Sequence, residues 1–584
     1  LTAVGTSAGA AVTSGAKNTA VGFGAGTALT TSDNNVVMGY NALYRATTES
    51  DDNVVIGYNA MSGNFTTAVV NDVVAIGSGA LAGTLTADAT GTTVVGTAAG
   101  AAITSGQKNT AVGYGALTAE TDGDFSVAVG YNALAASTGK NGTSANVAVG
   151  YSAGSAITSG SSNTIVGYLA GDAIDTMTDN TAIGAGALGG SSLVDKTVVI
   201  GSGAGAAAMT ADADGTIAIG YQAGLAITSG EKNTAVGYEA LNAQATGDLS
   251  TAVGYQALKA CTGVSGEIGN TAFGYQAGLA VTTGQANIAI GIGSLRTTTT
   301  GGMNICIGRD TMVDVDAGSS SLASGSNIFI GDQAGSGQWA DANSSENVAI
   351  GKGAMPAALN GASENVCIGQ EVANALLQGD ANTLVGKRAG YGVTDGANNT
   401  CIGKNAGGVL TTGVDNICIG NNLDVSAAGA DTQCVIGNDF QADADGAIHI
   451  GDAAVHIRCD WENDSTWDRD SDERIKNITG DSPLGLDFLN AIPVKTFTWK
   501  ARSEHPETFK SYDEEETEPV NALLNTGVIA QTVKAALDSA GVDYWSGWSE
   551  MSDGCQQVGE SAFVFPLIKA VQELSAKVTA LENA

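Results

Sequence analysis

The chain has 584 residues, including 82 glycines and six prolines, with 43% apolar and 5% aromatic residues and a formal net charge of −35. Glycine without a Gly-X-Y period excludes collagen, and the apolar fraction is too high for a disordered chain. So negative a surface repels nucleic acid and anionic membranes, and no stretch reaches the roughly 18 apolar residues of a membrane span, so we expect neither nucleic-acid binding nor membrane insertion.

A repeated motif, N-[T/V/I]-[A/C]-[V/I]-G-[Y/x]-x-A-[G/L], fills residues 1–452. Its central glycine recurs 26 times, from Gly5 to Gly451, most often 17 residues apart. This period is too short for helix-pair repeats and fits one coil of a β-solenoid with two short strands and two turns. At about 4.8 Å per stacked strand, the coils predict a shaft roughly 120 Å long. Clear copies of the motif are Asn18–Gly26, Asn109–Leu117, Asn233–Leu241, Asn347–Met355 and Asn399–Gly407.

Side chains in the T-A-V-G stretch alternate between two faces. Thr110 and Val112 share one face, and Ala111 and Gly113 share the other. We expect the Val/Ile face to fill the inside of the coil and the flat Ala/Gly face to approach another backbone. A single coil cannot bury its apolar face alone, so stacking and neighbouring chains must stabilise the shaft.

These units resemble the head repeats of trimeric autotransporter adhesins, whose S-V-A-I-G-type coils form parallel β-rolls in trimers. The resemblance covers residues 1–452 and implies a mainly β, homotrimeric β-roll shaft. Because the chain begins at Leu1, inside a repeat and without methionine, we expect an attachment region to be missing.

Several residues of the repeat are candidate ligands, and a structural role is favoured for most of them. His449 occupies the alanine position of its repeat and is expected to be packed, with an ion held by three histidines around a trimer axis as the alternative. Cysteines assigned to the same position are expected to be small buried hydrophobes, with a cross-link or a metal at the axis as the alternative. These cysteines are Cys306, Cys367, Cys401, Cys418 and Cys434.

No metal and no cofactor is predicted. Asp212 with Asp214 and Asp443 with Asp445 offer oxygen ligands, but the full calcium-binding repeat pattern is absent. Gly184–Gly189 matches G-x-G-x-x-G, yet no helix of adequate length can follow it before the next strand.

The residue after the central glycine changes along the shaft. It is tyrosine in many early units, including Tyr114 and Tyr238, and becomes polar or charged from Arg309 onward. We favour tyrosines stacked on their neighbours over a sugar-binding ladder. The insertion between Gly308 and Gly331 and the next one, with Trp339, are predicted to contact the host because loops often carry recognition.

The composition changes after residue 452. Residues 453–470 read as an acidic linker, and five of the six tryptophans and five of the six prolines lie beyond residue 460. Gly527–Gln531 opens an expected helix that continues through Leu537. Pro566 begins a final helix. Apolar residues at 4-3-4-3 spacing predict a short coiled-coil seam along it. They are Leu567, Val571, Leu574, Val578 and Leu581.

Ser471–Ile478 (SDERIKNI) and Gly527–Gln531 (GVIAQ) are similar to the intramolecular chaperone of endosialidase family. The resemblance covers residues 471–584 and implies a small α+β domain that trimerises, guides folding of the preceding β-structure and then cleaves itself off. It also implies a serine–lysine dyad with Ser471 as nucleophile and Lys476 as base, and a scissile bond between Asp470 and Ser471.

The sequence therefore predicts a homotrimeric tail fibre of a bacteriophage, located in the virion and assembled in the host cytoplasm. Its expected partners are other virion tail proteins and a host cell-surface receptor, and its only expected chemistry is the single self-cleavage. The alternatives are a tailspike that depolymerises host glycans, which needs paired carboxylates in a groove, and a bacterial surface adhesin.

Overall fold

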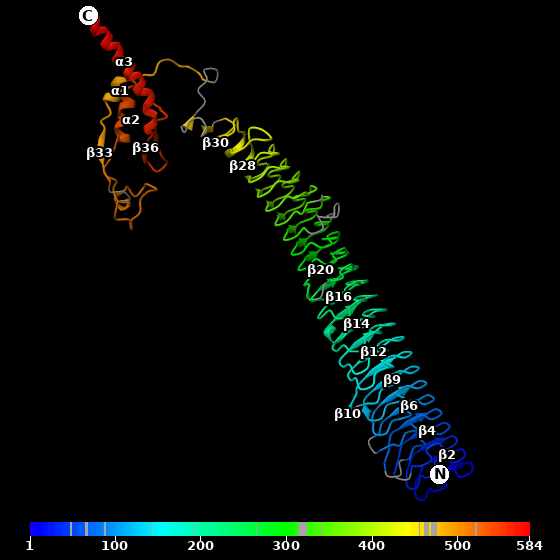
Figure 1. Ribbon diagram of the computed structural model, residues 1–584. Helices are drawn as coiled ribbons and strands as arrows, with labels where there is room; N and C mark the ends of the chain where they lie inside the picture. The colour runs from blue at the N-terminus through cyan, green and yellow to red at the C-terminus, as the bar shows by residue number, and fades with distance from the viewer. Residues whose placement is uncertain are drawn as a thin grey trace. The chain divides into compact units, whose positions relative to one another are not determined.

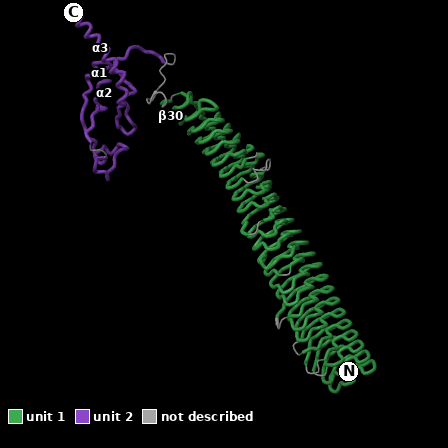
Figure 2. Tube along the Cα trace, viewed as in Figure 1, with its two compact units in different colours: residues 1–469 green, residues 470–584 purple. Residues whose placement is uncertain are grey.

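The protein forms two compact units, Leu1–Arg469 and Asp470–Ala584 (Figure 2). The computed structural model describes residues 1–46, 49–64, 68–86, 89–139, 142–191, 193–263, 266–313, 324–339, 342–454, 456–460, 467–468, 476–519 and 523–584. Within these ranges, none of the helices is both long and apolar enough to span a membrane.

The first unit is a parallel β-solenoid (Figure 1). Most coils contribute one three-residue strand, which pairs in parallel with the strand of the next coil. In β7 and β9, for example, Thr110 lies beside Val127 and Val112 beside Val129. The resulting sheet has 28 strands, the last two antiparallel. The predicted parallel β-solenoid of about 17-residue coils is thus confirmed.

The parallel strands follow one another at the spacing of the central glycines. They are β1 (Thr2–Val4), β2 (Thr19–Val21), β3 (Val36–Met38), β4 (Val54–Ile56), β5 (Val74–Ile76), β6 (Thr93–Val95), β7 (Thr110–Val112), β9 (Val127–Val129), β11 (Val147–Val149), β12 (Thr164–Val166), β13 (Thr181–Ile183), β14 (Val198–Ile200), β15 (Ile217–Ile219), β16 (Thr234–Val236), β18 (Thr251–Val253), β20 (Thr271–Phe273), β21 (Ile288–Ile290), β22 (Ile305–Ile307), β23 (Ile328–Ile330), β24 (Val348–Ile350), β25 (Val366–Ile368), β26 (Thr383–Val385), β27 (Thr400–Ile402), β28 (Ile417–Asp424), β29 (Cys434–Gln441) and β30 (Ala447–Asp452).

The opposite side of each coil consists mostly of turns, not of the second strand that the sequence predicted. Two pairs of two-residue strands interrupt these turns. They are β8 (Gly123–Asp124) with β10 (Gly142–Thr143), and β17 (Gly247–Asp248) with β19 (Gly266–Glu267).

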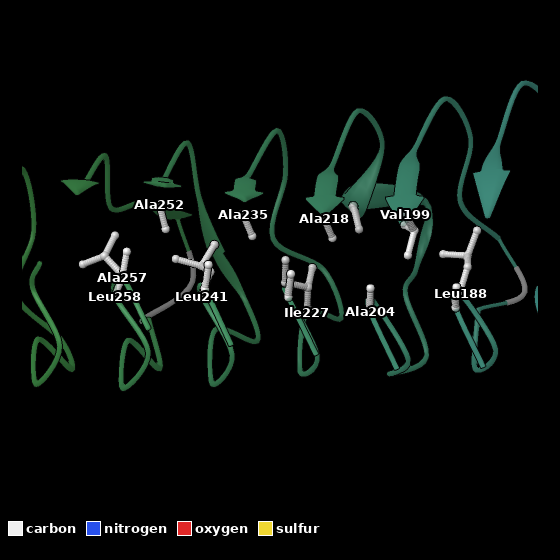
Figure 3. Close-up of a cluster of buried hydrophobic side chains, with 14 of the residues drawn as sticks. Leu188, Val199, Ala204, Ala218, Ile227, Ala235, Leu241, Ala252, Ala257 and Leu258 are labelled. Carbon is white, nitrogen blue, oxygen red and sulfur yellow. The ribbon is translucent and has the colours of Figure 1, made fainter. Parts of the chain in front are cut away.

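The buried face of the strands is the reverse of the predicted one. Ala111 is fully buried, whereas Thr110 and Val112 remain half-buried on the outside. In Figure 3, Ala235 and Ala252 point inward from their strands toward larger side chains, such as Leu241, on the turn side. The interior of a coil is narrow, so a small residue on the strand side is needed opposite leucine, isoleucine or methionine on the other side.

The central glycine is required by its backbone conformation and by its neighbour. Gly113 has a φ of 138°, which L side chains rarely adopt. A methyl group at its Cα would also overlap the carbonyl oxygen of Gly130 in the next coil. Stacking of coils at the strand spacing therefore leaves room only for glycine at this position.

Buried asparagines before the strands form a second column. The Asn382 side chain donates a hydrogen bond to the Gly396 carbonyl oxygen, at 2.8 Å, and its own oxygen accepts one from the Asn399 backbone N–H, at 3.0 Å. The Asn399 side-chain amide also donates to this oxygen, at 3.0 Å. Each such asparagine therefore bonds to both the turn and the motif asparagine of the next coil.

The sheet of the shaft extends beyond residue 452. After the longer strands β28, β29 and β30, strand β31 (His456–Asp460) turns back antiparallel to β30, and β32 (Trp467–Asp468) pairs with β31. The remaining residues of the expected linker fall largely outside the described residues.

The second unit combines helices with two small antiparallel sheets (Figure 1). A buried cluster that includes Phe488, Val533 and Leu537 forms its core, and Trp545 and Phe563 pack against it. Its elements are α1 (Leu486–Asn490), β33 (Lys495–Phe497), η4 (Arg502–Glu504), β34 (Asn525–Gly527), α2 (Ala530–Ser539), β35 (Trp548–Glu550), β36 (Gln556–Val558), η5 (Glu560–Phe563) and α3 (Val564–Glu582). This confirms a small α+β domain that ends in a helix.

Candidate functional site

The structure places only one member of the expected dyad. Asp470 and Ser471 lie outside the described residues, and Lys476 is exposed on the single chain. A lysine can accept a proton from serine only when it is uncharged, which requires burial or a neighbouring cation. The serine–lysine dyad therefore stays a prediction.

Four of the five repeat cysteines lie inside the coils. Cys306, Cys367, Cys401 and Cys418 are fully buried, and burial raises the pKa of Cys306 and Cys367 well above the ordinary thiol value. The prediction for Cys434 was wrong, because it pairs with Ile417 and lies half-buried on the outer side of the sheet, one residue before the alanine position. The four buried thiols are enclosed by their own chain and cannot meet at an axis between chains.

Several of the histidine and aspartate candidates lie beside polar groups of their own chain. His449 is buried inside the coil, and its Nε2 lies 3.5 Å from Asp443 Oδ1. Asp445 accepts a hydrogen bond from the Gln433 side-chain amide at 2.6 Å, and Asp214 accepts one from the Asp195 backbone N–H at 2.7 Å. Across the described ranges, no group of three or more histidine, cysteine, aspartate or glutamate residues is arranged to hold a metal ion.

The two insertions expected to contact a host have different outcomes. Trp339 is fully buried, with its ring 5.6 Å from that of Phe329, so this side chain belongs to the core and not to a recognition surface. Residues 314–323, within the insertion between Gly308 and Gly331, lie outside the described residues.

The outward side of the strands forms what we call the outer face. It has three columns of side chains, represented in one coil by Thr110, Val112 and Tyr114. Rings of the third column stack on one another from coil to coil, as with Tyr114 and Tyr131, whose centroids are 5.2 Å apart. The rings from Tyr221 to Tyr275 form a similar stack. The prediction that these tyrosines stack on their neighbours is confirmed.

The last helix, α3, exposes a second apolar strip. The residues predicted to form the seam are 45–77% exposed. On the inner side, Glu573 accepts a hydrogen bond from the Leu486 backbone N–H at 2.8 Å, which ties α3 to α1. The helix is therefore fixed to its unit on one side and exposed along the seam.

The second unit also contains a cavity of about 1000 Å³ that the sequence analysis missed. Trp499, Phe509 and Val528 contribute to its walls, and His505 Nδ1 lies 2.8 Å from Ser511 Oγ at its rim. Its lining residues are scattered over residues 497–560, so no local sequence pattern marked it.

Residues 471–542 match the family model described as chaperone of endosialidase. A comparison with curated proteins found no match for the chain. A parallel β-solenoid of about 25 turns followed by such a domain matches the organisation of a tail fibre with a C-terminal chaperone domain. The same combination fits a phage tail fibre or a tailspike-like protein, and the chaperone domain is typical of phage tail proteins.

Proposed function

We propose that this chain is the shaft of a bacteriophage tail fibre that attaches the virion to its host, and that residues 471–584 are the chaperone that folds it. The observation that carries this proposal is the direct succession of an in-register β-solenoid and a chaperone-of-endosialidase match. Other virion tail proteins and a host surface receptor are the partners of such a fibre. Binding of the purified protein to a panel of candidate host cells tests attachment, and failure to bind any of them contradicts it.

The fibre is proposed to be a homotrimer. Two apolar surfaces of the single chain support association: the Val/Ile column of the outer face, which is half-exposed over the whole shaft, and the seam of α3. Monomeric proteins rarely expose apolar patches of this extent. Sedimentation of the Ser471→Ala protein tests the proposal, because a trimer of uncleaved chains has three times the chain mass of 57.9 kDa.

The seam of α3 does not select three strands by itself. In heptad terms Val571 and Val578 occupy a positions, and Leu574 and Leu581 occupy d positions. Valine at a with leucine at d favours two-stranded coiled coils. The shaft and the rest of the second unit must therefore provide the three-fold symmetry, and α3 adds stability to it.

Self-cleavage is proposed to proceed by attack of the Ser471 hydroxyl on the Asp470 carbonyl carbon. Lys476 takes the hydroxyl proton and delivers it to the departing Ser471 nitrogen, which leaves an ester between Asp470 and the serine oxygen. Water then hydrolyses this ester and releases the Asp470 carboxylate. Because Lys476 is exposed on the single chain, assembly has to provide the burial that makes it a base.

Replacement of the nucleophile tests this chemistry. Ser471→Ala should leave only full-length chains in the assembled protein, as seen by denaturing electrophoresis and intact mass. The matched control Ser482→Ala removes an exposed serine elsewhere in the same unit and should cleave like the wild type. Cleavage after residue 470 in Ser471→Ala would show that this serine is not the nucleophile.

A further inference from the structure

The outer face has two edges with different residues. In the coil of β24, Glu346 lies two residues before the strand and Lys352 two residues after it, and both are exposed. We call the position before the motif asparagine the leading edge and the position after the central glycine the trailing edge. Six residues of chain, roughly 20 Å if extended, separate the two edges within one coil.

In the C-terminal part of the shaft the charged residues of the leading edge are acidic and those of the trailing edge are mainly basic, with Asp332 as an acidic exception that pairs with Arg309 and Lys352 on the same edge. The leading edge has the exposed acids Glu346, Glu364 and Asp415, and the trailing edge has exposed basic residues, among them Lys352 and Lys404. Backbone hydrogen bonds stack these positions from coil to coil, as between the Glu371 N–H and the Lys352 carbonyl oxygen. In the part of the chain that the structure describes, the three acids and Lys404 form no ion pair.

In three N-terminal coils both edges differ from this pattern. The trailing edge is aromatic at Phe23, Tyr114 and Tyr238. The leading edge of these same coils carries Lys17, Lys108 and Lys232. Lysine beside an aromatic face is a favourable pair, as acid beside lysine is. Acids on the N-terminal leading edge, at Asp52, Asp72 and Asp179, lie in coils whose trailing residue is uncharged.

We propose that the leading edge of one chain meets the trailing edge of the next chain around the shaft. This inference rests on the trimer proposed above. In a closed ring of three chains every interface joins two different surfaces, so one edge must meet the other. Complementary residues on edges that lie far apart within a chain are what such an interface requires.

The pairing also limits the axial register of the chains. When equal coils lie at equal height, Glu346 of one chain meets Lys352 of the next. Glu364 lies one coil from Lys352, and Asp415 lies one coil from Lys404, which is about 4.8 Å and within reach of a lysine side chain. A slip by one coil that sets Glu346 against Asp332, a like-charge contact, sets Glu364 and Asp415 level with these lysines. The charges therefore hold the chains within one coil of equal height without choosing between these two registers.

Charge reversal tests the pairing. Lys352→Glu with Lys404→Glu should lower the temperature at which the trimer dissociates by several degrees at low salt. Adding Glu346→Lys and Asp415→Lys should restore most of the loss, because each pair is then reversed and not broken. The control, Arg45→Glu with Arg296→Glu, makes the same change in net charge away from both edges and should behave like the wild type. At high salt the dissociation temperatures of all four proteins should become similar, because salt screens these charges.

The outcomes separate this inference from the trimer itself. If the wild type is a monomer, the proposed trimer fails. The wild type can also be a trimer whose edges do not meet. Two results would show this: a four-fold variant that dissociates at no higher temperature than the double variant, or a control whose dissociation temperature falls as far as that of the double variant.

Cross-linking gives a direct second test. A chain with both Glu346→Cys and Lys352→Cys should yield covalent dimers and trimers with a short bifunctional maleimide, since the span within one chain is too long for the reagent. Chains with either substitution alone control for the natural cysteines and should give no such products. A double variant that stays uncross-linked in the assembled trimer overturns the pairing.

Discussion

At the scale of single residues, one glycine and one asparagine per coil fix how the coils stack. The glycine permits a backbone conformation and a spacing that a Cβ atom forbids, as at Gly113. The asparagine satisfies two buried backbone groups of the next coil, as at Asn382. Both residues act on the backbone, so replacing either one should destabilise the stacking of neighbouring coils and not only the packing of one side chain.

Replacement of the central glycine should destabilise the shaft for two reasons, backbone strain and a clash with the next coil, and a control variant can separate them. Gly113→Ala places a methyl group in a positive-φ backbone and against the carbonyl of Gly130, so we expect a loss of about 3 kcal/mol or more in the free energy of unfolding. Denaturant unfolding measures it. Gly79→Ala has a positive φ of 66° but open space around the added atom, and should lose only about 1 kcal/mol. Equal losses would contradict the role of close stacking.

The asparagine column should be sensitive in a graded way. Asn382→Ala leaves the Asn399 N–H and the Gly396 carbonyl without partners, and we expect a loss of about 2–4 kcal/mol in the free energy of unfolding. Asn382→Thr should be milder, because Thr92 fills this position in another coil and donates its hydroxyl to the Gly106 carbonyl oxygen of the next coil at 3.4 Å. A threonine variant no better than the alanine variant would count against hydrogen bonding as the cause.

At the scale of elements, the sequence predicted the positions of the coils correctly but not which face of each strand lies inside them. The period and the T-A-V alternation placed strands such as β7 correctly, and GVIAQ placed the start of α2, because both signals are local. Which strand face is buried depends on the width of the coil, set by the turn residues opposite the strand, such as Leu241 opposite Ala235. The width of the coil is a tertiary property, so it cannot be read from any short segment of the motif. The assignment of Ser471 to a serine–lysine dyad rests on the family resemblance alone.

The end of the shaft should open more easily in acid. His449 lies inside the coil closed by β30 and β31, and burial lowers its pKa below the ordinary value of 6.5. Asp443 opposes this shift, while Arg458 and His456 add to it. Since the folded state holds the neutral ring, the opened state binds the proton first as pH falls below about 6.5. Stability of this segment is therefore fully present above pH 6.5 and decreases below it.

Hydrogen exchange of residues 447–460 measures this effect. After correction for the intrinsic rate, protection should fall between pH 7 and pH 5.5 in the wild type. It should change little in His449→Val, because valine fills the same inner position at Val435. Equal pH dependence in both proteins would show that another group causes the opening.

At the scale of the whole molecule, the correct register of the shaft is difficult to reach during folding but stable once it has formed. Its coils are nearly alike, so a strand such as β9 can pair with a wrong partner at little energetic loss. Once formed, the stack is held by repeated backbone and side-chain bonds between every two coils. A folding aid at one end is thus needed to choose the register and is dispensable afterwards.

Removal of residues 471–584 should accordingly have opposite results before and after folding. A chain expressed without them should aggregate or give a poorly ordered shaft. In a Ser471→Ala background, which prevents the proposed self-cleavage, a protease site inserted between residues 469 and 470, cut after assembly, should release the second unit and leave a shaft that melts within a few degrees of the uncut protein. After full denaturation, the uncut protein should refold and the isolated shaft should not. Circular dichroism and sedimentation follow each step. A shaft that folds unaided would remove the need for the chaperone, and one that melts on cutting would make the second unit a structural clamp.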